Sequence, residues 1–376
     1  MFYINNSLRI GVGLILFAAL ACARAQSMES GTPRWQRIEL GAADARYAFA
    51  IYSNRPWSGD MRGVTSAVLV FHGLGRNGVG YFTAAEKLLA ASGANARDVL
   101  LIAPNFFVPA DTKKHALDGM PLWSGAGNSS SAWMRGGDAL NWPRPLSAFQ
   151  PIDDLLAALI DPVRFPQLDR IVVAGHSAGG QIVQRYAALN AIDEKVRAAG
   201  TRLSYVIANP SSYLYFTPER AGDTGGASFA PFDAAACPDF NQYRYGVENI
   251  VRYARDARDA RDAGDLDGVA LFKRYAAREV IYLLGTADND PQHRELDKQC
   301  GARAQGSHRL ERGRIYLRYE RHLAGSGTTL NRRAFEVIDV AHSQARMFGS
   351  SCGAVLLFGS SGQTNTLGAA CRALRF

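Results

Sequence analysis

The run from Ile171 to Gly180 constrains the fold of this chain more than any other segment. β-Branched and small apolar residues lead directly into the pentapeptide Gly175-His176-Ser177-Ala178-Gly179, and helix-forming residues follow from Gln181 to Leu189. We therefore predict a strand, a sharp turn with Ser177 at its tip, and a helix. Glycines two residues before and after the serine suit such a turn, because the backbone approaches closely there and leaves no room for a Cβ.

Apolar runs alternate with helical stretches along the rest of the chain. An N-terminal hairpin is predicted, followed by strands that alternate with helices, which is typical of a mostly parallel sheet covered on both faces. The expected fold class is therefore α/β. The predicted strands are Trp35–Leu40, Arg46–Ser53, Ala67–His72, Val99–Pro104, Arg170–Gly175, Leu203–Asn209, Val280–Gly285, Phe335–Val340 and Ala354–Gly359, and the predicted helices are Phe82–Ser92, Ile152–Ile160, Ser177–Leu189 and Ser343–Phe348.

Two long segments, around 105–150 and 211–248, interrupt this alternation. Both follow predicted strands at the end of the sheet where open α/β folds bind ligands, and loops of this length in a compact fold are usually functional. We expect them to form walls and a partial lid over a substrate cleft within a single domain spanning 26–376. Their aromatic residues would line an apolar pocket for uncharged acyl groups. These residues are Trp123, Trp133, Trp142, Tyr213, Tyr215 and Phe216.

Four segments together resemble the α/β-hydrolase superfamily, in the order in which that superfamily has them. They are the strand and His-Gly turn at Val68–Gly75, the serine turn at 175–179, the strand ending in Gly-x-x-Asp at Val280–Asp288, and the strand ending in a histidine at Phe335–Ser343. A closer similarity is to a group of secreted serine esterases with polyester-depolymerase-like members. The segments that carry it are 175–186, 209–213 and 305–313.

The resemblance implies a serine, histidine and acid acting together, with no metal or organic cofactor. Ser177 is the expected nucleophile, and His342 is the expected base because it stands directly after the last strand of this order. Asp288 fits the Gly-x-x-Asp spacing better than Asp290, which we expect to cap the turn before Pro291. The backbone amides of Leu74 and Ala178 are the expected oxyanion donors, with Gly73 as an alternative to Leu74.

Two other classes of function compete with an exported serine hydrolase that cleaves small or polymeric esters. The segment Gly73–Gly78 also matches the G-x-G-x-x-G pattern of dinucleotide-binding oxidoreductases. However, the next strand, Val99–Pro104, does not end in the acidic residue that such a site requires. The third class is a hydrolase fold without activity that serves as a binding protein, and the presence of Ser177, Asp288 and His342 argues against it.

The N-terminal segment 1–25 has the features of a secretory signal peptide. Arg9 precedes an apolar run that is short for a membrane span, and Ala23-Arg24-Ala25 forms a small-residue cleavage site. We therefore expect a secreted or periplasmic protein without stable membrane insertion. Four of the five cysteines remain after cleavage, and the favoured pairing among three possibilities is Cys237–Cys300 with Cys352–Cys371, the second tying the C-terminal tail to the strand predicted at Ala354–Gly359.

The charge pattern gives little support for a nucleic-acid partner. The formal net charge is +8, and basic residues are interleaved with acidic ones rather than grouped into a block. A three-residue repeat at Arg255–Ala263 places Arg and Asp at helical spacing, which predicts a solvated helix face with weak ion pairs.

Overall fold

The computed structural model describes residue 1 and residues 35–222, 225–256, 267–359 and 368–374. Apart from Met1, the predicted signal segment 1–25 lies outside these ranges, as does most of the repeat at 255–263. Within the described ranges, no helix combines the length and the hydrophobicity needed to cross a membrane.

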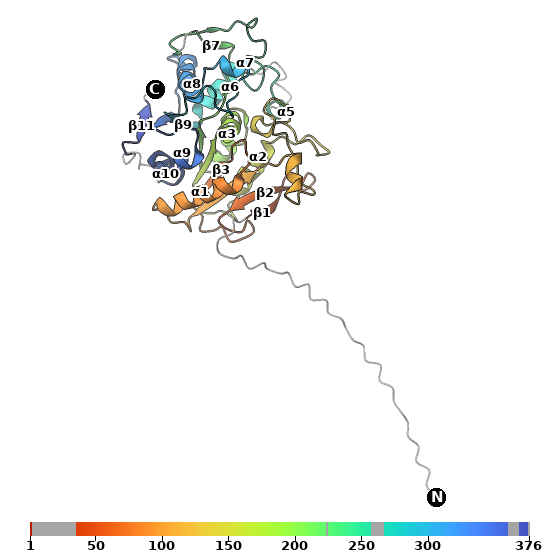
Figure 1. The fold of residues 1–376 in the computed structure, drawn as a ribbon. Helices are drawn as coiled ribbons and strands as arrows, with labels where there is room; N and C mark the ends of the chain where they lie inside the picture. Colours follow the sequence, from red (N-terminus) through yellow and green to blue (C-terminus); the bar gives the residue numbers. More distant parts are fainter. Residues whose placement is uncertain (2–34, 223–224, 257–266, 360–367, 375–376) are drawn as a thin grey trace. The chain divides into compact units, whose positions relative to one another are not determined.

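A mixed sheet of nine strands forms the centre of the fold, in the order β1-β2-β4-β3-β5-β6-β9-β10-β11 (Figure 1). Strands β4, β3, β5, β6, β9 and β10 run parallel, whereas β1, β2 and β11 pair antiparallel with their neighbours. The strands are β1 (Trp35–Leu40), β2 (Tyr47–Ser53), β3 (Ser66–Phe71), β4 (Val99–Asn105), β5 (Arg170–His176), β6 (Arg202–Ala208), β9 (Glu279–Gly285), β10 (Arg332–Val337) and β11 (Cys371–Leu374), with a separate small hairpin of β7 (Glu219–Ala221) and β8 (Phe229–Pro231).

Helices cover both faces of the sheet because strand residues are apolar at odd and even positions alike. In β3, for example, Val68 and Val70 belong to one core, whereas Ala67 and Leu69 belong to the other. The helices are α1 (Gly78–Ala91), α2 (Gln150–Leu159), α3 (Ala178–Leu189), α4 (Asp193–Ala198), α5 (Arg252–Asp256), α6 (Gly268–Ala277), α7 (Cys300–Arg303), α8 (Arg309–Ala324), α9 (Gln344–Phe348) and α10 (Ser351–Phe358), with two short 3-10 turns at Pro109–Lys113 and Trp133–Arg135.

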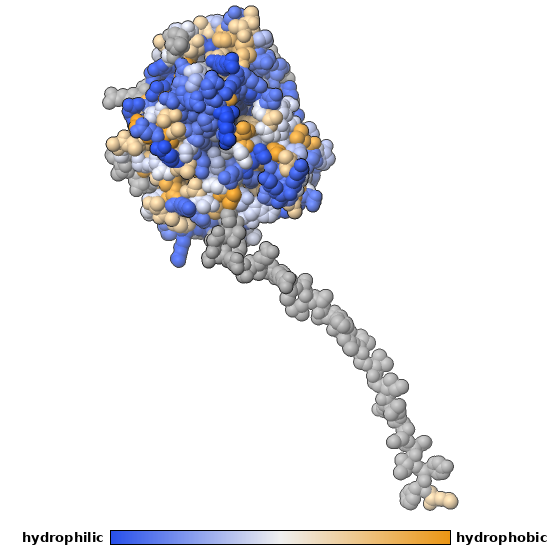
Figure 2. All heavy atoms as spheres, in the orientation of Figure 1, coloured by the Kyte–Doolittle hydropathy of each residue, from blue (hydrophilic) through white to orange (hydrophobic). Residues whose placement is uncertain are grey.

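Each face of the sheet has its own set of helices. Side chains of α1, α9 and α10 pack on the face that carries Val68 and Val70. Side chains of α2, α3, α6 and α8 pack on the opposite face. This arrangement confirms the predicted α/β-hydrolase fold with a mostly parallel sheet. On the side of the molecule drawn in Figure 2, hydrophilic residues predominate and hydrophobic ones form small scattered groups.

The predicted strand at Ala354–Gly359 is wrong. These residues lie largely in the helix α10, and the antiparallel edge strand is formed instead by Cys371–Leu374, which pairs with β10. An uninterrupted apolar run of this length fits a buried strand and a buried helix equally well. Here Ser350 accepts a hydrogen bond from the Gly353 amide with its side chain, and this N-cap starts the helix.

Both predicted disulfides are present. Cys237–Cys300 joins the second long segment to the start of α7, and Cys352–Cys371 joins α10 to β11, with Cα–Cα distances of 5.7 and 5.5 Å. The first bridge closes a loop of 63 residues in sequence separation and the second a loop of 19. Each therefore restricts the unfolded chain, and the longer loop restricts it more.

We expect loss of the Cys237–Cys300 bridge to cost more stability than loss of Cys352–Cys371. The loop-entropy relation gives about 4 and about 3 kcal/mol for the respective losses. Urea unfolding of the two double Cys→Ser variants measures this difference, with the oxidised parent protein as the reference. The expectation fails if alkylation under denaturing, non-reducing conditions finds these four cysteines free.

Candidate active site

Ser177 occupies a strained turn between β5 and α3. Its backbone has φ 61° and ψ −120°, a conformation that a residue with a side chain rarely adopts, and its amide donates a hydrogen bond of 2.9 Å to the Ala208 carbonyl. A Cβ on Gly175 would collide with the Gly179 carbonyl oxygen, and a Cβ on Gly179 would collide with that of Phe71. The close approach expected from the glycine spacing is therefore observed.

A chain of two hydrogen bonds joins Ser177, His342 and Asp288. The distance from Ser177 Oγ to His342 Nε2 is 2.8 Å, and the distance from His342 Nδ1 to Asp288 Oδ2 is 2.7 Å. Ser177 and Asp288 are buried, and the His342 side chain is only 6% exposed. The three sequence-predicted side chains, which come from β5–α3, β9 and β10, therefore meet at the carboxyl edge of the sheet.

Backbone and side-chain hydrogen bonds tie the loop that carries Asp288 to the loop that carries His342. The Ala287 amide donates to the Val340 carbonyl at 3.1 Å, and the Asp339 amide donates to Thr286 Oγ1 at 2.8 Å. Asp290 takes no part in this contact, because its exposed carboxylate accepts the Gln292 amide and caps the local turn. Adjacent parallel strands thus fix the spacing between the acid and the imidazole.

A buried arginine holds the second oxygen of Asp288. Arg309, at the start of α8, places Nη1 3.3 Å from Asp288 Oδ1, and its side chain is fully buried. Burial raises the pKa of Asp288, but the hydrogen bond to His342 and the charges of His342 and Arg309 outweigh it. The pKa of Asp288 consequently lies below its usual range, so the carboxylate is ionised at neutral pH.

Two further histidine rings contact the ring of His342. The ring centroid of His176 lies 4.6 Å away and that of His293 lies 5.0 Å away. Burial, with a smaller contribution from the nearby charges, lowers the pKa of His176 far below its usual value. Burial also lowers the pKa of His293, as do Arg309 and His342. A neutral ring at 176 leaves the Asp288 carboxylate as the closest ionised partner of the His342 imidazole.

His72 fixes the turn that follows β3. Its Nδ1 lies 2.9 Å from the Gly73 carbonyl oxygen, and its Nε2 accepts the Phe106 amide at 3.0 Å, so the ring donates at one nitrogen and accepts at the other. Complete burial lowers the pKa of His72 to about 4, which keeps the ring in this neutral form. The ring therefore connects the β3 turn to the end of β4.

The expected oxyanion donors border the serine. Ala178 is the first residue of α3, and the first four amides of a helix have no acceptor within the helix. Gly73 packs closely, since a Cβ there would lie 3.6 Å from Ser177 Cβ and 2.9 Å from the Tyr81 hydroxyl. Gly73 is buried against Tyr81, whereas Leu74 is half-buried and lines the neighbouring cleft, which favours Leu74 over Gly73 as the amide open to a substrate.

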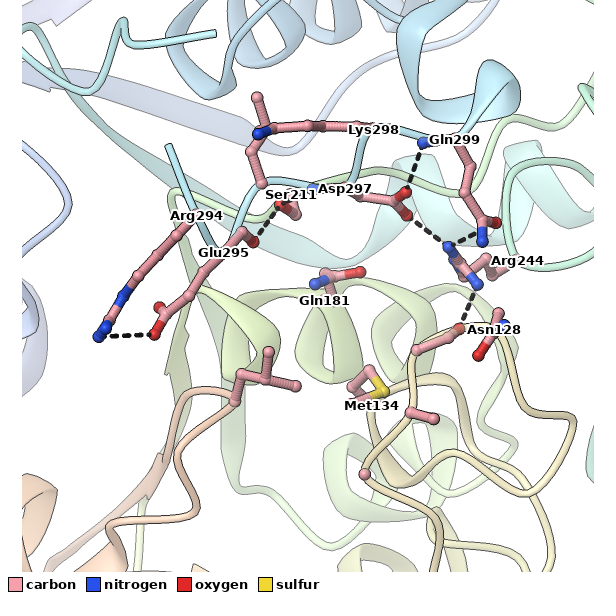
Figure 3. Close-up of a pocket in the computed structure, with 15 residues that line it drawn as sticks. Asn128, Met134, Gln181, Ser211, Arg244, Arg294, Glu295, Asp297, Lys298 and Gln299 are labelled. Carbon is pink, nitrogen blue, oxygen red and sulfur yellow. Dashed lines mark hydrogen bonds and ion pairs between the residues drawn. The ribbon is translucent and has the colours of Figure 1, made fainter. Parts of the chain in front are cut away.

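A cleft of about 400 Å³ lies next to the start of α3 and is lined by Gln181 and Leu74, while Ser177, Asp288 and His342 are not among its lining residues (Figure 3). Gln181, one turn along α3 from Ser177, lies between the segment 294–299 and the loop with Asn128 and Met134. The lining residues are Leu74, Gly125, Ala126, Gly127, Asn128, Met134, Gln181, Ser211, Arg244, Arg294, Glu295, Leu296, Asp297, Lys298 and Gln299. Both long segments contribute, together with a third, 294–299, that the sequence analysis did not single out.

The predicted aromatic walls are wrong. Five of the six aromatic residues are buried in the core, and Trp142 is half-buried against it, so none of the six lines this cleft. Tyr213, for example, stacks on Tyr316 of α8 with ring centroids 4.4 Å apart. The aromatic residues anchor the two segments to the fold, and polar and charged residues line the cleft together with the aliphatic and thioether side chains of Leu74, Ala126, Met134 and Leu296.

Sequence reasoning missed Arg309 and His293 as neighbours of the site. Both lie in polar stretches without a preceding strand, and the contact of each with the site depends on how β9, the 286–299 segment and α8 fold together. Nothing in the local sequence distinguishes Arg309 from the other arginines of the same helix.

Comparison with known proteins gives a consistent assignment of the fold. Residues 67–357 match the model of the alpha/beta hydrolase family. Poly(aspartic acid) hydrolase-1 from Sphingomonas sp. KT-1 is 21% identical, with a TM-score of 0.57 and coverage of 86% of this chain and 98% of that chain. LpqC, a poly(3-hydroxybutyrate) depolymerase from Bordetella parapertussis, is 19% identical, with a TM-score of 0.57 and coverage of 90% and 94%. No curated protein matches the chain at a significant level.

The neutral state of His72 predicts a loss of stability in acid. Because the folded-state pKa is about 4 and the unfolded value is about 6.5, the unfolded chain binds a proton that the folded chain does not. The contribution is complete above the unfolded pKa and falls as the pH drops toward 4, by about 3 kcal/mol in all. Urea unfolding at pH 7, 6 and 5 measures this loss as a fall in the free energy of unfolding. In His72→Gln, the free energy of unfolding should depend less steeply on pH. An equally steep slope in that variant contradicts the assignment.

Proposed function

The chain belongs to the alpha/beta hydrolase family, and we propose from that premise that it is an exported serine hydrolase that cleaves carboxylic esters through an acyl-enzyme. The observation that carries the proposal is the hydrogen-bonded chain from Ser177 through His342 to Asp288. A base within hydrogen-bond reach of the nucleophile, itself oriented by a third group, is the arrangement that activates a serine hydroxyl.

In the proposed reaction, Ser177 Oγ attacks the ester carbonyl carbon while His342 Nε2 takes the hydroxyl proton. The tetrahedral intermediate then collapses, the bond to the alcohol oxygen breaks, and the proton on Nε2 passes to the leaving alcohol. Water attacks the acyl-enzyme with His342 again acting as base, and the carboxylic acid leaves as the serine proton is restored. Asp288 keeps the Nδ1 proton directed toward itself and stabilises the imidazolium that forms at each step.

The amides of Leu74 and Ala178 are the proposed donors to the oxyanion. Ala178 begins α3, so the partial positive charge of the helix N-terminus adds to its N–H. Leu74 lies in the turn that the neutral His72 ring holds in place. These donors are fixed before the substrate arrives, and therefore need no reorganisation as negative charge develops on the carbonyl oxygen.

Export is supported by the sequence of residues 1–25 and by the two disulfides, since disulfides persist mainly in oxidising compartments. The two structural neighbours are described as acting on polymers. Short hydroxyalkanoate oligomers therefore belong in a substrate panel beside monomeric esters and the matching anilides. Faster turnover of esters than of anilides is the expected outcome for this reaction class.

A fluorophosphonate probe should label the protein at Ser177. The probe forms a covalent bond only with an activated serine, so labelling tests the hydroxyl and its base together. Ser177→Ala should remove both the label and the esterase activity, whereas Ser343→Ala, a change to the helix-capping serine beside His342, should remain labelled. A label that persists in Ser177→Ala would refute the proposed nucleophile.

Asp288→Asn should reduce turnover by about 10⁴-fold, because an amide at this position no longer orients the tautomer or stabilises the imidazolium. Asp290→Asn is the matched control, since Asp290 is exposed and bonds only to its own turn. That variant should keep turnover within a few-fold of the parent protein. Steady-state kinetics with one soluble ester compares them, and the opposite ranking would show that the acid is Asp290.

A further inference from the structure

The walls of the cleft carry more positive than negative side chains. Arg244, Arg294 and Lys298 face two carboxylates, Glu295 and Asp297. Arg244 is paired with Asp297 at 2.5 Å, and Arg294 lies 3.5 Å from Glu295 with its own side chain 88% exposed. Lys298 donates to a backbone carbonyl and so adds a positive charge at the rim that no carboxylate of the lining balances (Figure 3).

A fully buried arginine lies directly behind this lining. Arg185 on α3 donates to the backbone carbonyls of Gln181 and Arg244 and to the hydroxyl of Ser212. Gln181 and Arg244 both line the cleft, so the guanidinium is separated from it by a single layer of residues. Within the described part of the chain, none of its hydrogen-bond partners is a carboxylate, and its charge is therefore not neutralised locally.

Two more arginines around the cleft, the half-buried Arg135 and the buried Arg312, have the same kind of partner. Arg135, next to Met134 of the lining, donates to the carbonyls of Tyr243 and Ser129. Arg312 on α8 donates to the carbonyls of Gly306 and Ser211, and Ser211 also lines the cleft. The described ion pairs include none to a carboxylate from either residue. Backbone carbonyls satisfy these donors, and the Asp297 carboxylate, which is paired with Arg244, acts on both guanidiniums without forming an ion pair with either.

The positive charges act on one another through the low-dielectric interior. Burial lowers the pKa of Arg185 to about 10, and the charges of Arg244 and Arg135 add to that effect. Burial also lowers the pKa of Arg312 to about 10; the charge of Asp297 opposes this effect, and the charge of Arg309 adds to it. All of these groups stay protonated at neutral pH, so the excess positive charge is permanent.

We propose that the cleft beside Ser177 binds an anionic group of the substrate, so that the preferred esters carry a carboxylate near the scissile bond. Burying a guanidinium without a counter-ion is unfavourable, and a carboxylate in the cleft would offset that cost for several arginines at once. The inference rests on the proposed esterase function and specifies its substrate class.

The test compares two esters of nearly equal size, the mono-4-nitrophenyl ester of adipic acid and 4-nitrophenyl hexanoate, with the rate without enzyme subtracted. At low salt we expect kcat/KM for the adipate to exceed that for the hexanoate by about tenfold, because a cleft of one charge sign concentrates the opposite charge. In about 0.5 M NaCl the ratio should fall several-fold, since screening weakens the exposed part of the attraction.

Single substitutions of charged residues in the lining test whether the preference for the adipate depends on their charge. R294Q and K298Q should each lower the adipate-to-hexanoate ratio, and E295Q should raise it. R62Q is the matched control, because the Arg62 side chain is also well exposed, at 74% against 88% for Arg294, but precedes β3 at the opposite edge of the sheet and pairs with Asp60. Equal changes in R62Q and R294Q would overturn the proposal, since net charge alone would then explain them.

A second pair of esters locates the carboxylate. 4-Acetoxybenzoic acid carries it on the leaving alcohol, and methyl 4-acetoxybenzoate is its neutral counterpart. A higher kcat/KM for the anionic ester in either pair supports the proposal. The pair that shows the preference tells whether the carboxylate lies on the acyl side or the alcohol side of the scissile bond. Hydrolysis of both neutral esters without preference for either anion overturns the inference and leaves the proposed function intact, whereas failure to hydrolyse any ester overturns both.

Discussion

The fit of α3 against the ends of β3 and β5 is the constraint on which the rest of the site depends. The helix can start this close to the strands because positions 175 and 179 are glycines. A Cβ at either position would collide with a backbone carbonyl oxygen. That contact forces Ser177 into positive φ, presents its hydroxyl beyond the strand ends, and leaves the Ala178 amide free of intrahelical partners. The strain at Ser177 is offset by the surrounding packing, as expected where a fold over-determines one residue.

The electrostatics of the site follow from which groups are kept neutral. His72 and His176 are buried and have lowered pKa values, so neither adds a positive charge near the imidazole of His342. Asp288 is kept ionised by His342 and by the guanidinium of Arg309. An imidazolium at His342 would therefore face one carboxylate at hydrogen-bond distance and a neutral ring at 176. In the proposed mechanism, this arrangement stabilises the transient cation and does not require Asp288 to accept the proton.

The sequence predicts well the features that depend on residues close together in the chain. The turn at 175–179, the parallel strands and the positions of Ser177, Asp288 and His342 could all be predicted, because local spacing or chain order specifies each of them. The sequence favours one disulfide pairing among three possibilities, and the structure decides between them. Helix α10 could not be predicted, since its apolar run does not distinguish strand from helix. Arg309 could not be identified either, because its contact with Asp288 is made only when α8 packs beside the 286–299 segment.

The aromatic residues of the two long segments show the same limit for the cleft. Their composition indicated an apolar pocket, yet rings such as Trp123 and Tyr215 fill the core, and arginines hold the backbone of these segments in place. Arg185, Arg135 and Arg312 thus combine two effects, because the donors that fix the loop carbonyls also place positive charge behind the cleft. Removing any of them would disturb the walls and the field together. Only the exposed rim residues, Arg294 and Lys298 among them, can separate the electrostatic contribution to substrate choice from the structural one.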